Sequence, residues 1–344
     1  MASSIELQAP FFVSPQTLRK SISNRNTLKV TEHIAKANST LFSIEVLPPM
    51  KGKTIQDLFR VLDPLMEFKP PFVDVTYHRE EILYKKRTDG LVQRIPIRKR
   101  PGTVGICAAI TARYQVDAVP HLVCGGFTKE ETEDAIFTLH YLGIQNFLLL
   151  RGDALKSEAR FEPTDGGHLF ASDLVEQVAN MNKGIFLHEE TSTESRTDFC
   201  IGVAGYPEKH FEAPNLNNDL RWLKKKVDAG ADYIVTQMFF DNKHYFDFVD
   251  KCRAAGITIP IIPGIKPITT KRQINSLPPL FHIDIPDDLC SAIENCKDNK
   301  AAKQIGIEWA IEQSKELIKA NVPCVHYYSM SRHEPILAIA KECF

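Results

Sequence analysis

Short apolar runs rich in β-branched residues recur along the chain and alternate with longer amphipathic stretches. Most of these runs are nearly continuous in apolar residues, as is typical of strands that are buried on both faces. Eight strands are predicted, over residues 41–47, 72–77, 119–124, 146–151, 199–205, 232–240, 259–265 and 324–330. Strands that alternate with helices in this way predict a parallel sheet.

The amphipathic stretches carry helix start and stop signals. The stretch 128–143 is the clearest, because Thr128 and Glu131 form a capping box at its start and Gly143 ends it. Further helices are predicted over residues 54–68, 168–182, 217–230, 241–256 and 333–342, with at least one more within 286–320. The alternation predicts an α/β protein, a (β/α)8 TIM barrel. An open doubly wound sheet is the alternative, although no G-x-G-x-x-G or G-x-x-x-x-G-K-[ST] motif follows a strand.

Three segments stand outside this alternation. Residues 79–102 are strongly basic and contain Asp89-Gly90, a hairpin signal, so we interpret them as a solvated insertion after the second strand. Residues 183–198 are polar and predict a loop. We expect residues 1–29 to be a disordered N-terminal tail, although their Ser-rich, acid-poor composition weakly resembles a transit peptide. Residues 30–344 are then expected to form a single domain, in place of the two that 344 residues would also allow.

Composition narrows the possible partners. The chain has 42 Lys and Arg against 43 Asp and Glu, so its formal net charge of −1 gives no footprint for nucleic acid. No apolar run approaches the roughly 18 residues of a membrane span. None of the eight cysteines forms a C-x-x-C pair, which argues against a structural metal site and favours free thiols in the cytoplasm.

Candidate chemistry is expected at the carboxyl ends of the strands, where barrel enzymes place their active sites. Glu45 lies within the apolar run FSIEVLPP. Burial there would raise the pKa of its carboxyl group toward the range of a general acid, unless an arginine pairs with it. The fourth strand ends in Arg151, Gly152 and Asp153, which could bind an anion or a polar ring edge, or form a mutual surface ion pair.

Other strands also end in polar residues. Asp219 and Lys226 are about two helical turns apart, so both can lie on one side of their helix. The amide of Gln237 stands beside Met238 and two phenylalanines, which suits a heteroaromatic ring. The remaining strand-end candidates are Thr76, Tyr77, His121, Tyr206, His210 and Arg332.

Nine motifs resemble, in their order, those of a known family. They are FSIEVLPP, DVTYHRE, PHLVC, LLLRGD, FASDLV, GVAGYPEKHFEAP, DLRWLKKKVDAGADYIVTQMFFD, IIPGIKPI and HYYSMSR. Each is weak alone, but nine in order from about residue 29 to the C-terminus are specific. The chain resembles methylenetetrahydrofolate reductases of the bacterial type, which have the catalytic domain only.

The resemblance implies a barrel that holds FAD without a Rossmann fold. It implies a ping-pong reaction in which NADH or NADPH reduces the flavin, and the flavin then reduces 5,10-methylenetetrahydrofolate to 5-methyltetrahydrofolate for methionine synthesis. A homo-oligomer is expected. Because the chain ends at Phe344, just after the predicted barrel, we expect no regulatory domain and no inhibition by S-adenosylmethionine.

The family's site residues carry over by position. Glu45 matches the general acid, and Asp153 matches the carboxylate near the flavin and the pterin. Gln237, Gln273 and Arg332 match substrate-side positions, with Arg332 placed to reach the glutamate tail. The expected FAD contacts are Thr76, Tyr77, His121, Arg151, Gly152, Asp153, Ala171, Tyr206, His210, Ala213, Asp219, Lys225 and Lys226.

The chain also departs from the family pattern. Met238 stands where Phe is usual, Leu277 where some members have a stacking ring, and Phe170 where Tyr is often found, which affects stacking details. Two alternatives remain open at this point: another FAD- or pterin-binding barrel, similar to a proline dehydrogenase or a methyltransferase, and a non-catalytic flavin- or folate-binding barrel.

Overall fold

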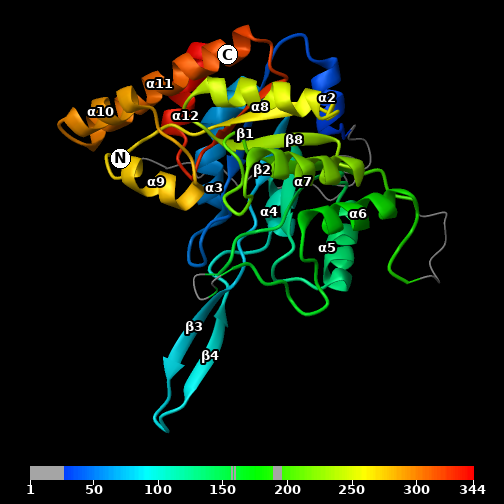
Figure 1. The fold of residues 1–344 in the computed structure, drawn as a ribbon. Coiled ribbons are helices and arrows are strands. Elements are labelled where there is room, and N and C mark those ends of the chain that lie inside the picture. The colour runs from blue at the N-terminus through cyan, green and yellow to red at the C-terminus, as the bar shows by residue number, and fades with distance from the viewer. Residues whose placement is uncertain (1–26, 156–157, 159, 189–195) are drawn as a thin grey trace, which may run out of the picture.

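Eight parallel strands close into a barrel at the centre of the molecule (Figure 1). The computed structural model describes residues 27–155, 158, 160–188 and 196–344. The strand order is β1-β10-β9-β8-β7-β6-β5-β2, and β2 returns to pair with β1. The strands are β1 (Leu41–Val46), β2 (Phe72–Val75), β5 (Asp117–Val123), β6 (Asn146–Leu150), β7 (Cys200–Gly205), β8 (Tyr233–Met238), β9 (Ile261–Ile265) and β10 (Cys324–Tyr328). All eight predicted strands and the (β/α)8 barrel are confirmed, and the open sheet is wrong.

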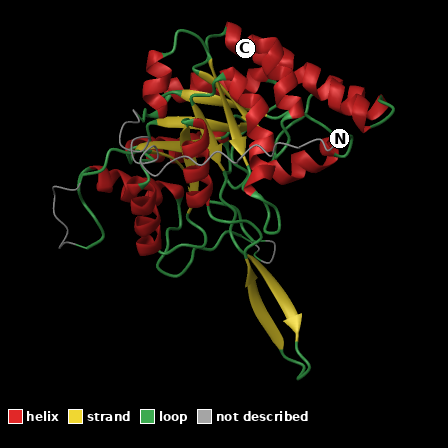
Figure 2. Ribbon diagram, turned by 180° about the vertical axis from the view of Figure 1, so that it is seen from behind, coloured by secondary structure: helices red, strands yellow, loops and turns green. Residues whose placement is uncertain are grey.

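Helices surround the barrel (Figures 1 and 2). Those at predicted places are α3 (Ile55–Leu62) with the 3-10 helix η1 (Asp63–Phe68), α5 (Lys129–Tyr141), α6 (Ala171–Asn182), α7 (Leu216–Asp228), α8 (Asn242–Ala254), α10 (Asp287–Asn295), α11 (Asn299–Lys319) and α12 (Glu334–Cys343). The predicted capping box is present, since Glu131 N donates to Thr128 Oγ1 at 3.1 Å and Thr128 N donates to Glu131 Oε2 at 2.8 Å. The single helix predicted over 54–68 is two elements, because Pro64, near the start of η1, has no backbone N–H with which to continue helix α3.

Three of the helices in the described part of the chain were not predicted, namely α2 (Val30–Lys36), α4 (Thr103–Tyr114) and α9 (Gln273–Phe281). Helix α4 is apolar over most of its length and has no clear polar face, while α9 contains Pro278 and Pro279. Helix α2 covers the N-terminal end of the barrel. Its Val30 packs with buried residues at the starts of the strands, and the Val30 N–H donates to Asn146 Oδ1 at 2.8 Å.

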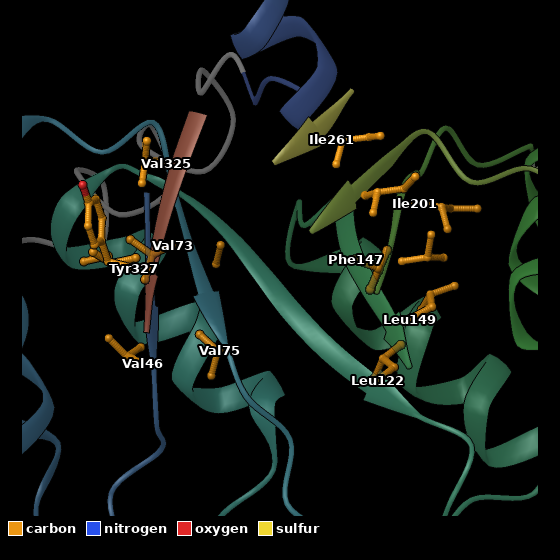
Figure 3. Close-up of a cluster of buried hydrophobic side chains, with 14 of the residues drawn as sticks. Val46, Val73, Val75, Leu122, Phe147, Leu149, Ile201, Ile261, Val325 and Tyr327 are labelled. Carbon is orange, nitrogen blue, oxygen red and sulfur yellow. The ribbon is translucent and has the colours of Figure 1, made fainter. Parts of the chain in front are cut away.

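The largest apolar core lies between the barrel strands and the surrounding helices. Figure 3 shows part of it, with Val46, Val75, Leu149, Ile201 and Tyr327 among the labelled side chains. A second cluster fills the barrel interior near the strand starts and includes Phe72 and Tyr233. This packing holds the strands firmly, so that the residues at their carboxyl ends are presented from a rigid frame.

The basic insertion forms a hairpin that projects from the barrel (Figures 1 and 2). It consists of β3 (Glu81–Lys86) and β4 (Val92–Ile97), which pair only with each other in the described structure. Gly90 adopts a φ of +83° in the turn, as the Asp89-Gly90 signal predicts. Most hairpin side chains are exposed, so the interpretation as a solvated insertion is confirmed.

Membrane spans, metal sites and disulfides can be checked for the described residues. No described helix is long and apolar enough to cross a membrane. Among the described residues, no group of three or more metal-ligating side chains could hold a metal ion. All eight cysteines are free thiols. Residues 1–26 of the predicted tail and residues 189–195 of the predicted loop lie outside the described part of the chain.

Candidate active site

A deep cleft opens at the carboxyl ends of the barrel strands. We call it the central cleft, and it encloses about 1240 Å³ of empty space, part of it open to solvent. Its walls include Glu45 from β1, Thr76 and Tyr77 after β2, His121 from β5, Arg151, Gly152 and Asp153 after β6, Tyr206 and His210 after β7, Gln237 from β8 and Tyr328 from β10. Residues that are far apart in the sequence therefore meet where the barrel rule predicts.

Glu45 lies near the end of β1 with its side chain in the central cleft. Burial raises the pKa of its carboxyl group to about 7, while His121, whose Nε2 lies 3.9 Å from Glu45 Oε2, pulls it down. No arginine or lysine forms an ion pair with Glu45 in the described part of the chain. The backbone carbonyl of Glu45 accepts a hydrogen bond from Ser329 Oγ at 2.7 Å, which fixes the strand end. The carboxyl group can thus hold a proton near neutral pH.

A polar network that the sequence did not reveal lies next to Glu45 in the barrel interior. Asp74 of β2 is 1% exposed, and its Oδ2 lies 3.2 Å from His121 Nε2. His326 of β10 is fully buried, with Nδ1 2.8 Å from Ser43 Oγ and 4.0 Å from Asp74 Oδ1. Burial raises the pKa of Asp74 to about 7. A carboxyl group buried between two histidines is costly to maintain, and groups with such shifted pKa values gather at functional sites.

In the Arg151-Gly152-Asp153 segment, Arg151 forms its ion pair with Glu212 and not with Asp153. Arg151 makes two hydrogen bonds to Glu212, at 2.5 and 2.9 Å, and stacks over Phe161. A mutual Arg151–Asp153 pair is therefore wrong, and Glu212, 61 residues away, is a partner that the sequence could not indicate. Gly152 has a φ of +84°, where a side chain would be strained.

The central cleft continues into a second hollow, the outer cavity, between the ends of β6 and β7 and helices α6 and α7. It encloses about 830 Å³ of empty space, part of it open to solvent. The two spaces share Leu150, Arg151, Ala204, Tyr206 and His210 as walls. Together they form one elongated cleft. Its outer part is lined by Phe170, Ala171, Ala213, Asp219, Trp222 and Lys226, among others.

Charged groups in the outer cavity are held in place by backbone contacts. Asp219 Oδ2 accepts from the His210 N–H at 2.9 Å, and Lys226 Nζ donates to the carbonyl of Ala204 at 2.5 Å. Burial lowers the pKa of Lys226 to about 8, with Asp219 opposing. Asp219 and Lys226 both line the outer cavity from the same side of helix α7, as their spacing predicted. Lys225 does not line the cavity, because it lies one position along the helix; its Nζ is 3.8 Å from Asp173 Oδ1 at the rim.

Phe170 and Trp222 form an aromatic wall in the outer cavity that the sequence did not single out as a pair. Their ring centroids are 5.0 Å apart and the rings are stacked at 26°. Both rings are partly exposed, at 36% and 41%. An exposed stacked pair beside the partly buried Lys226 suits a flat, phosphate-bearing ligand.

The remaining predicted residues are split between two places. Gln237 lines the central cleft, and its Oε1 accepts from the Met238 N–H at 2.9 Å. Gln273, Leu277 and Arg332 instead line a neighbouring hollow, the side pocket, between the ends of β9 and β10 and helix α9. Gln273 Oε1 accepts from the backbone of Thr269 and Thr270, at 2.6 and 3.0 Å. The side pocket and the central cleft share Phe281, Tyr328 and Met330 as walls.

A closed (β/α)8 barrel with a buried acid and an elongated polar cleft at its strand ends has the arrangement of a barrel enzyme. The chain belongs to the methylenetetrahydrofolate reductase family, whose model matches residues 29–343. Its relatives include Methylenetetrahydrofolate reductase (NADH) 1 of Arabidopsis thaliana, 32% identical over 89% of this chain and 48% of the relative. The 5,10-methylenetetrahydrofolate reductase of Escherichia coli is 32% identical over 86% of this chain and 88% of the relative.

The chain spans about half the length of the plant and yeast relatives that it matches. Among solved structures, an uncharacterized protein from Clostridium thermocellum that binds two copies of 5-methyl-5,6,7,8-tetrahydrofolic acid matches with a TM-score of 0.52. It is 13% identical and covers 91% of this chain and 98% of its own. That likeness supports the barrel fold.

Proposed function

We propose that this protein is a flavin-dependent reductase that converts 5,10-methylenetetrahydrofolate to 5-methyltetrahydrofolate with NADH or NADPH, in a ping-pong reaction that supplies methyl groups for methionine synthesis. The observation that carries the proposal is Glu45, a carboxyl group whose side chain is only 12% exposed and whose pKa is raised to about 7, in the central cleft of a chain of this family. Several relatives are named for NADH, which supports NADH as the reductant.

The elongated cleft fits an FAD molecule. Lys226 is a partly buried cation whose one hydrogen bond among the described residues goes to a carbonyl, which leaves its remaining ammonium protons able to meet a phosphate. The residues that would hold FAD are Thr76, Tyr77, His121, Arg151, Gly152, Asp153, Ala171, Tyr206, His210, Ala213, Asp219 and Lys226, with Lys225 at the rim. When bound, FAD accepts a hydride from the reduced nicotinamide and passes it to the folate.

Glu45 supplies the proton in this proposal. Its carboxyl group donates to a nitrogen of the five-membered ring of the substrate, so that the ring opens to an iminium that can accept the hydride. Asp153 and Gln237 border the same cleft and orient the substrate, and Asp153 also adds negative charge near the flavin. Gln273 and Arg332, in the side pocket, bind the more distant part of the folate.

The proposal extends to the whole molecule. We assign residues 30–344 to one catalytic domain, which is supported by the pairing of β1 with β10 near the two ends of this segment. A cytoplasmic location is supported by the eight free cysteines. A homo-oligomer is part of the proposal, and light scattering of the purified protein would test it.

An anaerobic experiment tests the proposal. The purified protein should be yellow, NADH should bleach it, and 5,10-methylenetetrahydrofolate should restore the colour and form 5-methyltetrahydrofolate. Bleaching by proline instead would favour a proline dehydrogenase, and methyl transfer without flavin reduction would favour a pterin-binding methyltransferase. A yellow protein that neither substrate changes would be a binding barrel. A colourless protein that takes up no FAD would contradict the proposal that the enzyme depends on a flavin.

A further inference from the structure

An arginine outside the central cleft contacts the segment that carries Asp153. Arg79 lies in the loop between β2 and the hairpin strand β3. Its side chain is 14% exposed, and its Nη1 donates to the backbone carbonyl of Asp153 at 3.2 Å. Arg79 is not among the described residues that line the central cleft, and the reaction described above gives it no part.

Arg79 holds the segment after β6 at two further points. Its Nη1 lies 3.7 Å from Glu158 Oε2, which also accepts from the backbone N–H of Leu155 at 2.8 Å. Its guanidinium group lies over the ring of Phe161, 5.5 Å from the centroid, and Phe161 is 6% exposed. One side chain thus contacts a carbonyl, a carboxylate and a buried ring, which together limit the positions that these residues can adopt.

The loop after β5 leaves room for this arginine. A Cβ atom at Gly125 would lie 2.5 Å from Arg79 Nε and 2.6 Å from Arg79 Cζ, so a side chain there would displace the guanidinium group. The backbone of Gly125 is not left-handed, so the close approach of Arg79 is what an alanine there would disturb. Arg79 therefore joins the loops after β2, β5 and β6.

Asp153 has little else to hold it in place. Its side chain is exposed, lines the central cleft, and makes no hydrogen bond or ion pair with another of the described residues. Burial, and then the negative charge of Asp153, raise the pKa of Tyr206 in the wall of the same cleft. The place of the carboxylate is thus set by the backbone of Asp153. Among the described residues, Arg79 makes the one hydrogen bond to that backbone.

We propose that Arg79 is a positioning residue, which fixes the backbone of Asp153 and so directs its carboxylate into the central cleft. This inference rests on the proposed function, in which that carboxylate orients the folate and lies near the flavin. Arg79 touches neither ligand and acts only through Asp153. The geometry of the cleft then depends on a side chain at the base of the β3–β4 hairpin.

The first test is a double-mutant cycle on ligand binding. Calorimetry measures the binding of 5-methyltetrahydrofolate to the wild type, Arg79→Met, Asp153→Asn and the double variant. Arg79→Met should weaken binding about tenfold, the scale of one charge-assisted contact. In the Asp153→Asn background the same change should weaken binding less than about twofold, because no carboxylate is left to position. A residue that only stabilises the fold would weaken binding equally in both backgrounds.

A second measurement needs no folate. Hydrogen exchange of the purified protein is followed by mass spectrometry on peptides that cover residues 150–155. Exchange there should be about three- to tenfold faster in Arg79→Met, because Glu158 loses its partner and holds the amide of Leu155 less firmly. Peptides from helix α11 serve as an internal reference and should exchange at the wild-type rate.

Three other variants sharpen the comparison. Gly125→Ala keeps Arg79 in the chain but occupies its space, so it should reproduce both effects of Arg79→Met. Arg79→Lys keeps the charge but not the planar fork, so it should retain part of the binding. Arg94→Met removes a charge from an exposed residue of β4 and should change neither measurement. Thermal unfolding shows which variants fold, and Gly125→Ala and Arg79→Lys carry the comparison if Arg79→Met does not.

Three outcomes would overturn the positioning role. One is unchanged exchange in both Arg79→Met and Gly125→Ala; another is an equal loss of folate binding with and without the Asp153→Asn change. The third is a loss in Arg94→Met as large as that in Arg79→Met, which would make net charge the cause. If the wild type binds no 5-methyltetrahydrofolate, the proposed function fails, and the exchange measurement still decides whether Arg79 holds Asp153.

Discussion

The Nε2 atom of His121 lies 3.9 Å from a carboxylate oxygen of Glu45, inside the barrel. The same atom lies 3.2 Å from Asp74 Oδ2, so that one imidazole nitrogen faces both the buried Asp74 and the largely enclosed Glu45. Burial lowers the pKa of His121, which keeps it neutral near pH 7 and leaves little positive charge to draw a proton from Glu45. Because burial raises the pKa of Glu45 to about 7, its carboxyl group can keep a proton available at the cleft.

The pH dependence of the folate half-reaction should follow Glu45. Its pKa is raised to about 7, and only the protonated form can donate. The rate of flavin re-oxidation by methylenetetrahydrofolate should therefore be level below pH 7 and fall up to tenfold per pH unit above it. Stopped-flow measurements from pH 5.5 to 9 check this. A rate that rises through pH 7 would mean that a base, and not an acid, controls the step.

Asp74→Asn should move this pH profile. The negative charge of Asp74 raises the pKa of Glu45, so its removal should shift the falling limb to lower pH. The half-reaction with NADH should keep its pH dependence, since no proton from Glu45 enters that step. An unchanged limb in the variant would show that Asp74 is only a packing residue.

Asp74→Asn should also change stability in a pH-dependent way. The folded-state pKa of Asp74 is raised, to about 7, so the stability that its protonated form contributes is present at low pH and is lost as pH rises through 7. Asparagine does not titrate. Between pH 5 and 8 the free energy of unfolding of the variant should therefore gain about 1–3 kcal/mol relative to the wild type. Urea unfolding at both pH values measures the difference, and a relative loss would contradict the sign.

Trp222 should report the binding of FAD. The chain has two tryptophans, and the other, Trp309, donates its indole N–H to the carbonyl of Phe240, away from the outer cavity. In a Trp309→Phe background, FAD added to the apoprotein should quench the fluorescence of Trp222. Trp222→Ala should weaken FAD binding about tenfold, as for loss of one stacking ring. Full affinity in that variant would mean that the aromatic wall does not contact the cofactor.

The β3–β4 hairpin should be dispensable for folding. Its strands pair only with each other in the described structure, and most of its side chains are exposed. Replacing residues 82–96 by a Gly-Ser turn should leave Tm within about 3 °C and FAD affinity unchanged. If the variant aggregates or loses its flavin, the hairpin is needed to stabilise the barrel and this prediction is wrong.

The sequence predicted the strands better than the helices, for a physical reason. Strands buried on both faces are apolar throughout, and all eight stood out. Helix α4 is also apolar, so it lacks the 3.6-residue alternation that marks an amphipathic helix, and α9 contains two prolines that normally argue against one. Tertiary packing forms both helices.

Site residues could be predicted where a single charged residue stood out in an apolar strand. Glu45 stood out as a charge in an apolar strand, and Asp74, in FVDV, carries the same signal and could have been found by the same rule. The pairing of Arg151 with Glu212 depends on how two loops meet, and no local pattern contains that information.

The proposed role of Glu45 as general acid is best tested by measuring the two half-reactions of Glu45→Gln. Glutamine keeps the size and polarity of the side chain but cannot donate an acidic proton. Measured anaerobically and separately, flavin reduction by NADH should stay within about threefold of the wild type, while re-oxidation by 5,10-methylenetetrahydrofolate should slow by about 10²- to 10⁴-fold. If both half-reactions slow together, or if neither does, Glu45 is not the general acid of the folate half-reaction.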